Sequence, residues 1–220
     1  MSSDSPRIPL LALLYQEYLD DQDSADFIGK VSRSYTLGTI ERLAGHEARQ
    51  VRRSAVLALG FLGSYEVNLI MGRALHDEDR TVRMLAENGI RNVWTRAGSE
   101  QQRRQLGAVL RLNSVREFQE AVCEATELIE KAPWLAEAWN QRAIARFALG
   151  FYTESIRDCH QALEINPYHF AAASGMGQAY LELGNKVSAL ESFRRALRLN
   201  PGLEAVRAQI ARLTRMIEDK

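Results

Sequence analysis

An internal repeat in the C-terminal half of the chain constrains the fold more than any other feature. The segments Trp139–Pro167 and Ala173–Pro201 align without a gap at a 34-residue shift. The alignment pairs Leu149-Gly150 with Leu183-Gly184, Ala162-Leu163 with Ala196-Leu197, and Asn166-Pro167 with Asn200-Pro201. A period of this length is typical of arrays in which small supersecondary units stack and bury a continuous core.

Each unit of this repeat predicts two antiparallel helices. Gly150 and Gly184 would end the first helix, because glycine adopts the left-handed closing conformation most easily. Pro167 and Pro201 would end the second helix, because proline cannot continue one. Small residues at 143, 155, 177 and 189 would let the two helices approach closely.

The pattern W-x2-R-A-x6-G-x4-S-x6-A-x4-P, which begins at Trp139, resembles the tetratricopeptide repeat (TPR). The resemblance implies helix-pair units at 136–169 and 170–203, with Ala173 in place of the usual bulky aromatic residue. A degenerate unit at 102–135 keeps the second-helix positions Phe118, Ala121, Ala125, Leu128 and Pro133, but its first helix, about 99–112, lacks the signature. A final helix over 203–218 is expected to cap the last apolar face.

The N-terminal half has a different, 31-residue period. Its first apolar stripe lies on one helix face and comprises Val51, Ala55, Ala58, Leu59 and Leu62. The shifted stripe comprises Val82, Ala86, Gly89, Ile90 and Val93, and Arg52 becomes Arg83. Shorter amphipathic helices are expected before them, at 36–43 and 65–75. Residues 8–18 and a helix over 25–33, capped by Ser24, are expected to begin the array.

This second repeat resembles HEAT repeats, more closely those of phycobilisome-lyase-like proteins. In that family a turn acid and an arginine of the next helix bond from repeat to repeat, forming a ladder. Arg52 and Arg83 match the arginine position. Asp77 or Asp79 is the expected acid in the second unit and can cap the following helix, and Glu47 is the nearest candidate in the first. The resemblance concerns the repeat unit and implies no lyase reaction.

The pair His46-Glu47 raises the alternative of a metal site. A metal needs several ligands brought together, and one repeat period after His46 the chain has Asp77 instead of a second histidine. Cys159 and His160 are adjacent and would point about 100° apart on a helix, which does not suit a thiol–base pair. We therefore interpret His46-Glu47 as a turn, and we expect no metal, no cofactor and no enzymatic activity.

A binding groove is the better-founded functional hypothesis. In TPR arrays the first helices of successive units line a concave surface, so amide and apolar residues there are candidates for holding a peptide. The candidates are Asn140, Gln141, Ile144, Phe147, Ser174, Gln178, Leu181, Gln209 and Arg212. Members that grip chaperone C-termini use lysine, asparagine and arginine at matched groove positions. Gln141 and Ile144 replace the asparagines here and the lysine is missing, which disfavours that partner class.

An arginine-rich segment, 91–116, supports an alternative partner. Residues 31–116 carry fourteen arginines against eight acids, although the chain as a whole has no net charge. Arg91, Arg96, Arg103, Arg104 and Arg111 could contact the phosphates of a nucleic acid or another polyanion. The same arginines could equally form ion pairs between repeats.

Composition and length complete the expectation. The 220 residues are 46% apolar and 25% charged, as in ordinary globular proteins. The longest apolar run, Ile8–Tyr15, is too short to span a bilayer, so we expect a cytoplasmic protein without a membrane segment. We predict an all-α right-handed superhelix in which a HEAT-like array (1–98) continues into a TPR array (99–220). Its expected function is that of a scaffold or adaptor for a protein or peptide partner.

Overall fold

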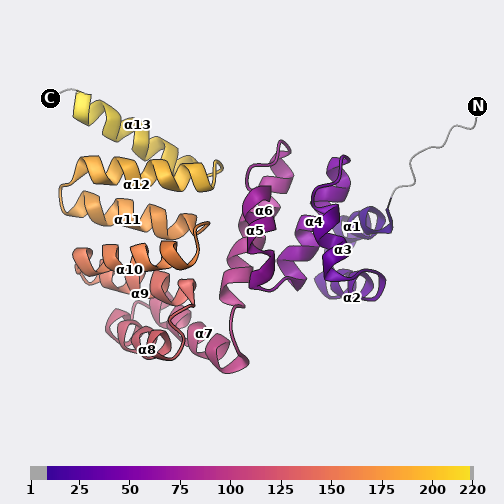
Figure 1. Ribbon diagram of the computed structural model, residues 1–220, viewed down its shortest axis with the longest axis horizontal. Coiled ribbons are helices and arrows are strands. Elements are labelled where there is room, and N and C mark those ends of the chain that lie inside the picture. Colours follow the sequence, from indigo (N-terminus) through magenta and orange to yellow (C-terminus); the bar gives the residue numbers. More distant parts are fainter. Residues whose placement is uncertain (1–8, 219–220) are drawn as a thin grey trace, which may run out of the picture. The chain divides into compact units, whose positions relative to one another are not determined.

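The computed structural model describes residues 9–218, and within this range every regular element is a helix (Figure 1). The all-α class predicted from the sequence is confirmed. Contacts divide the chain into two compact units between Val93 and Trp94. This division lies near the boundary at residue 98 that the sequence predicts for the change of repeat type.

The first unit is built from short helices joined by tight turns. Its elements are α1 (Leu10–Asp21), α2 (Ser24–Ser34), α3 (Leu37–Leu43), α4 (Arg49–Leu62), a 3-10 turn (Tyr65–Val67), α5 (Asn68–Ala74) and α6 (Arg80–Thr95), which crosses the division. The helix over 25–33 is present but Ser24 is not its cap. Asp23 takes that position, and its carboxylate accepts from the N–H groups of Ala25 and Asp26.

The turns before α4 and α6 are built alike. In the first, Nδ1 of His46 accepts a hydrogen bond from the N–H of Ala48 at 3.0 Å. In the second, Oδ1 of Asp77 accepts from the N–H of Asp79 at 2.8 Å. His46 and Asp77 are one repeat period apart, and each accepts from the N–H two positions further on. The interpretation of His46-Glu47 as a turn is therefore confirmed.

Arg52 and Arg83 hold these turns from the helix that follows each one. Nη1 of Arg52 donates to the carbonyl oxygens of His46 (3.0 Å) and Glu47 (2.8 Å). Nη1 of Arg83 donates to the two corresponding carbonyls of the second turn, at 2.7 and 3.0 Å. Arg52 also donates from Nε and Nη2 to the carboxylate of Asp77, at 2.8 and 3.0 Å, which ties one turn to the next. Asp77 is the acid in this bond between turns, and Glu47 supplies its carbonyl to Arg52 instead of the expected carboxylate.

A second ion pair joins α4 to the start of α6. Arg53 donates from Nε and Nη2 to the carboxylate of Asp79, at 2.9 and 2.6 Å. Asp79 also accepts from the N–H of Val82, so it caps α6 as the sequence predicts. The bonds from Arg53 stabilise the charged carboxylate and hold the pKa of Asp79 well below its usual range.

The helices α4 and α6 cross where each carries a glycine. A Cβ atom on Gly60 would lie 2.9 Å from the Cα of Gly89, which is closer than real Cβ atoms approach another atom. The two backbones therefore meet directly, and any side chain at either position would push the helices apart.

The second unit is a stack of helix pairs. It contains α7 (Glu100–Ser114), α8 (Phe118–Lys131), α9 (Ala136–Ala148), α10 (Tyr152–Ile165), α11 (Phe170–Glu182), α12 (Lys186–Leu199) and α13 (Glu204–Glu218). Each helix packs against the next, and the first helices of successive pairs, α7, α9 and α11, also contact one another in that order (Figure 1). The helices α8, α10 and α12 begin at 118, 152 and 186, so the 34-residue period holds through all three pairs.

The residues between the helices of each pair share one backbone conformation. Gly150 and Gly184 have positive φ angles of 84° and 72°, as the sequence predicts for helix-ending glycines. Arg116 occupies the equivalent position in the first pair and has a φ angle of 66°. The first pair thus adopts the same turn without the glycine that suits it.

Small residues bring the paired helices together. Oγ of Ser155 on α10 donates to the carbonyl oxygen of Ala143 on α9 at 2.8 Å. A Cβ atom on Gly177 of α11 would lie 2.7 Å from the buried ring of Phe193 on α12. Both contacts occur at positions where the repeat pattern predicts small residues.

Candidate functional site

An apolar cavity of about 150 Å³ lies among α9, α10 and α11. Its walls include four of the predicted groove residues: Asn140, Ile144 and Phe147 from α9 and Gln178 from α11. Small residues, among them Ala143, Cys159 and Gly175, complete it. The cavity thus lies between two successive first helices, where the repeat pattern expects the groove.

The cavity offers shape and apolar surface, and it offers no reactive group. Ile144 is 44% exposed and stands at its edge. Cys159 is buried in the wall, and burial raises the pKa of its thiol to about 12. His160, the neighbouring residue, is exposed and lines a different cavity. The thiol is therefore protonated at neutral pH and lacks a base beside it, which excludes it as a nucleophile.

Two of the predicted groove amides serve an internal network. Gln141 (Nε2) and Asn140 (Nδ2) donate to Oε1 of Glu137, at 2.6 and 3.1 Å. Nδ2 of Asn113 on α7 donates in turn to the backbone and side-chain oxygens of Gln141, at 3.0 and 2.9 Å. Gln141 is 8% exposed. We expect from the sequence that the side-chain amide of Gln141 is available to a peptide backbone. The structure corrects this, because the buried amide is already hydrogen-bonded to Glu137 and Asn113 inside the protein.

The other oxygen of Glu137 meets a histidine that the sequence did not single out for any role. Nε2 of His169 lies 2.9 Å from Oε2 of Glu137, and Nδ1 of His169 accepts from the N–H of Ala172 and so caps α11. The ring of Trp94 stacks on that of His169 at 4.3 Å. Burial raises the pKa of Glu137, but the hydrogen bond and charge of His169, together with the hydrogen bonds from Gln141 and Asn140, outweigh burial, so the net pKa is lowered.

The remaining predicted groove residues lie apart from the cavity walls. Ser174 and Leu181 are half-buried on α11, and Leu181 packs against the hydrophobic core of the unit. On α13, Gln209 is half-buried and Arg212 is exposed. The structure therefore concentrates the candidate groove at α9 and α11.

Most arginines of the segment 91–116 have internal partners. Arg91 pairs with Glu87 at 3.2 Å, and Arg104 pairs with Glu100 one turn away. Arg103 donates to the carbonyl oxygen of Gly98 at 2.6 Å. Arg96 is half-buried, and this burial lowers the pKa of its guanidinium. Arg111 is exposed on α7. Arg91 and Arg104 thus pair within their own helices, and none of these contacts is an ion pair between repeats, the alternative that the sequence left open beside polyanion binding.

Among residues 9–218 no group of three or more potential metal-ligating side chains comes together. No helix in the same range is long and apolar enough to cross a membrane.

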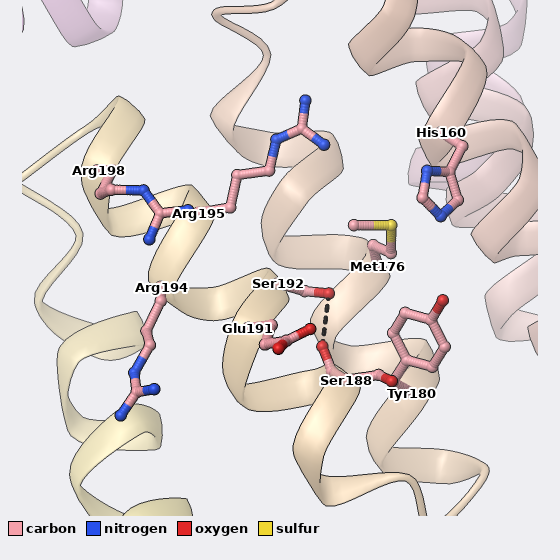
Figure 2. A pocket seen from close by; sticks show the side chains of 9 residues that line it. All are labelled: His160, Met176, Tyr180, Ser188, Glu191, Ser192, Arg194, Arg195 and Arg198. Atoms are coloured by element: carbon pink, nitrogen blue, oxygen red, sulfur yellow. Dashed lines mark hydrogen bonds between the residues drawn. The ribbon is translucent and has the colours of Figure 1, made fainter.

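A larger cavity, about 480 Å³, was not foreseen from the sequence. It is lined by His160 of α10, Met176 and Tyr180 of α11, and a set of residues on α12 that includes Arg194, Arg195 and Arg198. Figure 2 shows Arg195 extending from α12 toward the side where His160 lies, with Met176 between them and Tyr180 lower in the view. The signal for it was present as the basic run R-R-x-x-R near the end of α12.

Comparison with known proteins finds tetratricopeptide repeats in the second unit. Residues 134–201 match the tetratricopeptide repeat family. A TPR repeat-containing protein of Rhizobium etli is 36% identical over 84 residues, which are 38% of this chain and 41% of that protein. The Hsp70-Hsp90 organizing protein of Triticum aestivum is 28% identical over 94 residues, which are 43% of this chain and 16% of that protein.

Solved structures give the same fold. The first TPR domain of Spaghetti (RPAP3), bound to an HSP90 peptide, superposes with a TM-score of 0.53 at 20% identity, covering 55% of this chain and 96% of that one. TPR repeats are therefore present in this chain, and α9 to α12 form them. The chain spans less than half the length of the two curated relatives described above.

Proposed function

We propose that this chain is a non-enzymatic interaction module that holds a segment of a partner protein on the first helices of its TPR unit. The observation that carries the proposal is the apolar cavity that gathers Asn140, Ile144, Phe147 and Gln178 between α9 and α11. A relative named Hsp70-Hsp90 organizing protein, and a TPR domain bound to an HSP90 peptide, support this class of function.

The cavity has the size for one anchoring side chain. A volume of about 150 Å³ corresponds to cavities that hold a benzene-sized molecule. A branched aliphatic or aromatic side chain of the partner would fill it, and burying such a side chain contributes about 1.5–3 kcal/mol. Gln178, half-buried in the wall, is placed to bond the partner's backbone beside that anchor.

Filling the cavity from within tests the proposal without removing a wall residue. Gly175 lines the cavity, and a Cβ atom there would lie 3.6 Å from Sγ of Cys159, an ordinary contact. We expect Gly175→Leu to fill the space and to abolish binding of partners that wild-type protein retains from a host lysate. The helix should be no less stable, because glycine costs about 1 kcal/mol in a helix interior.

Gly107→Leu is the matched control. Gly107 lies on α7 at the position equivalent to Gly175, two repeat periods earlier, and a Cβ atom there would also have its nearest contact at 3.6 Å. Ile144→Glu is a second probe, because it places a charge at the cavity edge on a residue that is 44% exposed. If both Gly175→Leu and Ile144→Glu retain every partner that Gly107→Leu retains, the cavity is not the binding site.

The proposal extends to the first unit and to the setting of the protein. We propose that residues 1–98 are HEAT-like repeats, supported by the equivalent turns at His46 and Asp77 and by the equivalent arginines Arg52 and Arg83. A cytoplasmic location remains part of the proposal.

A further inference from the structure

The arginines that line the larger cavity lack the ion pairs that arginines form elsewhere in the chain. Arg91 and Arg104 each pair with a glutamate four residues earlier on the same helix. Arg195 also has a glutamate four residues earlier, Glu191, in the favourable orientation. Among residues 9–218, however, no salt bridge joins Arg194, Arg195 or Arg198 to any carboxylate.

The surroundings of these arginines make a site with both charge and apolar surface. Arg195 is half-buried, whereas Arg194 and Arg198 are exposed. The floor combines the side chains of Met176 and Tyr180 with the hydroxyl groups of Ser188 and Ser192 (Figure 2). Three guanidinium groups against the single carboxylate of Glu191 leave the lining with an excess of positive charge.

This cavity is separate from the apolar cavity of the proposed function. The two share no lining residue. On α10 Cys159 lines the apolar cavity and the next residue, His160, lines the arginine-lined one. This is possible because neighbouring residues of a helix point about 100° apart. Occupation of one cavity therefore leaves the other accessible.

We propose that the arginine-lined cavity is a second binding site, which takes an acidic protein segment with carboxylate side chains. Guanidinium groups bind carboxylates through paired hydrogen bonds. Arg194 and Arg198 are separated by four residues, a rise of about 6 Å along the helix axis. Alternate side chains of an extended chain are spaced by about 6.6 Å, so an acidic residue at every second position matches this spacing.

Binding of a defined peptide tests the site. The probe is a synthetic peptide that alternates glutamate with serine over seven residues. Its binding is compared with that of its glutamine counterpart by fluorescence anisotropy at about 0.15 M salt, where the Debye length is about 8 Å. We expect at least about tenfold tighter binding of the glutamate peptide, and a loss of about tenfold when Arg194, Arg195 and Arg198 are all changed to glutamine.

The control variant changes Arg80, Arg157 and Arg215 to glutamine, which removes the same charge from exposed positions outside the cavity. It should bind the glutamate peptide within about twofold of wild type, since general attraction between net charges is screened by salt. An equal loss in the control variant would show attraction by net charge alone and overturn the site. Equal binding of the two peptides would overturn it as well.

A spectroscopic readout locates the peptide independently of affinity. The ring proton signals of His160, assigned by their loss in His160→Gln, should shift when the glutamate peptide is added, whereas those of the buried His169 should not. Inorganic phosphate serves as the competing small anion. If phosphate shifts the same signals and the peptide does not, the site takes a small oxyanion and the proposed acidic segment is wrong.

Discussion

The buried carboxylate of Asp158 permits a sharp test of how the TPR unit is held together. Asp158 on α10 is 2% exposed and accepts three hydrogen bonds from α9. Two come from Arg142, through Nε and Nη2 at 2.9 Å each, and the third comes from Nη1 of Arg146 at 2.7 Å. Changing Asp158 to asparagine keeps the size of the side chain and removes its charge.

The loss of stability expected in Asp158→Asn depends on how deeply Arg142 and Arg146 are buried. The Arg142 side chain is 9% exposed, so it would remain buried without a counter-charge. Arg146 is 23% exposed and can turn toward water, so it adds little to the loss. Breaking a buried ion pair by removing one partner costs about 3–5 kcal/mol. For a unit of this size that corresponds to a fall in Tm of roughly 10–20 °C.

The assay is thermal unfolding followed by circular dichroism, with Glu100→Gln as the matched control. That substitution removes the same charge from the exposed pair with Arg104, and such pairs contribute at most about 0.5 kcal/mol. Replacing Arg142 and Asp158 together by methionine and leucine should recover part of the loss, because no buried charge is then left unpaired by the change. If Asp158→Asn lowers Tm no more than Glu100→Gln, the reasoning about this ion pair is refuted.

Three further outcomes are expected. Thiol titration of the native protein should detect the exposed Cys123 quickly. Cys159 should react only after denaturation, because burial raises the pKa of its thiol to about 12. Rapid reaction of both thiols would contradict the burial of Cys159. Arg116→Gly should raise stability by about 1 kcal/mol, because glycine adopts the positive φ angle without the cost that arginine bears, and an unchanged Tm would argue against strain there. The pKa of Asp79 is lowered in the folded protein, so the stability it contributes is present above the ordinary carboxyl pKa and is lost as pH falls through the lowered value. Urea midpoints should therefore fall more steeply below about pH 4 in wild type than in Asp79→Asn, and parallel curves would count against the Arg53 pair.

The two repeat periods were sufficient to predict most of the helices and the turns between them. The 34-residue period predicts the helix pairs of the second unit and the glycines that end α9 and α11, because these depend on local backbone conformation and on which residues face a neighbouring unit. The 31-residue period predicts the helices α4 and α6 and the arginines that follow their turns. Period alone could not give the partner of Arg52 in the first turn, because a backbone carbonyl and a glutamate side chain lie equally close in sequence.

The candidate site was only partly accessible from the sequence. Repeat position predicted Asn140, Ile144, Phe147 and Gln178 as candidate groove residues, and the structure brings these four to one cavity. Repeat position could not distinguish Gln141, whose amide is consumed by Glu137 and Asn113, because hydrogen-bond partners come from other helices.

The sequence by itself determined that this chain is helical, where its repeats begin, and which residues close its turns, since helix periodicity and turn chemistry act over a few residues. Tertiary structure decided which polar groups remain available to a partner. Glu137 and His169 are 32 residues apart in the sequence and are hydrogen-bonded to each other in the interior, so neither is available to a partner. Arg194, Arg195 and Arg198 instead line a cavity with His160 of another helix. Burial and pairing of charges depend on distances through space, and those distances are set only when the helices pack.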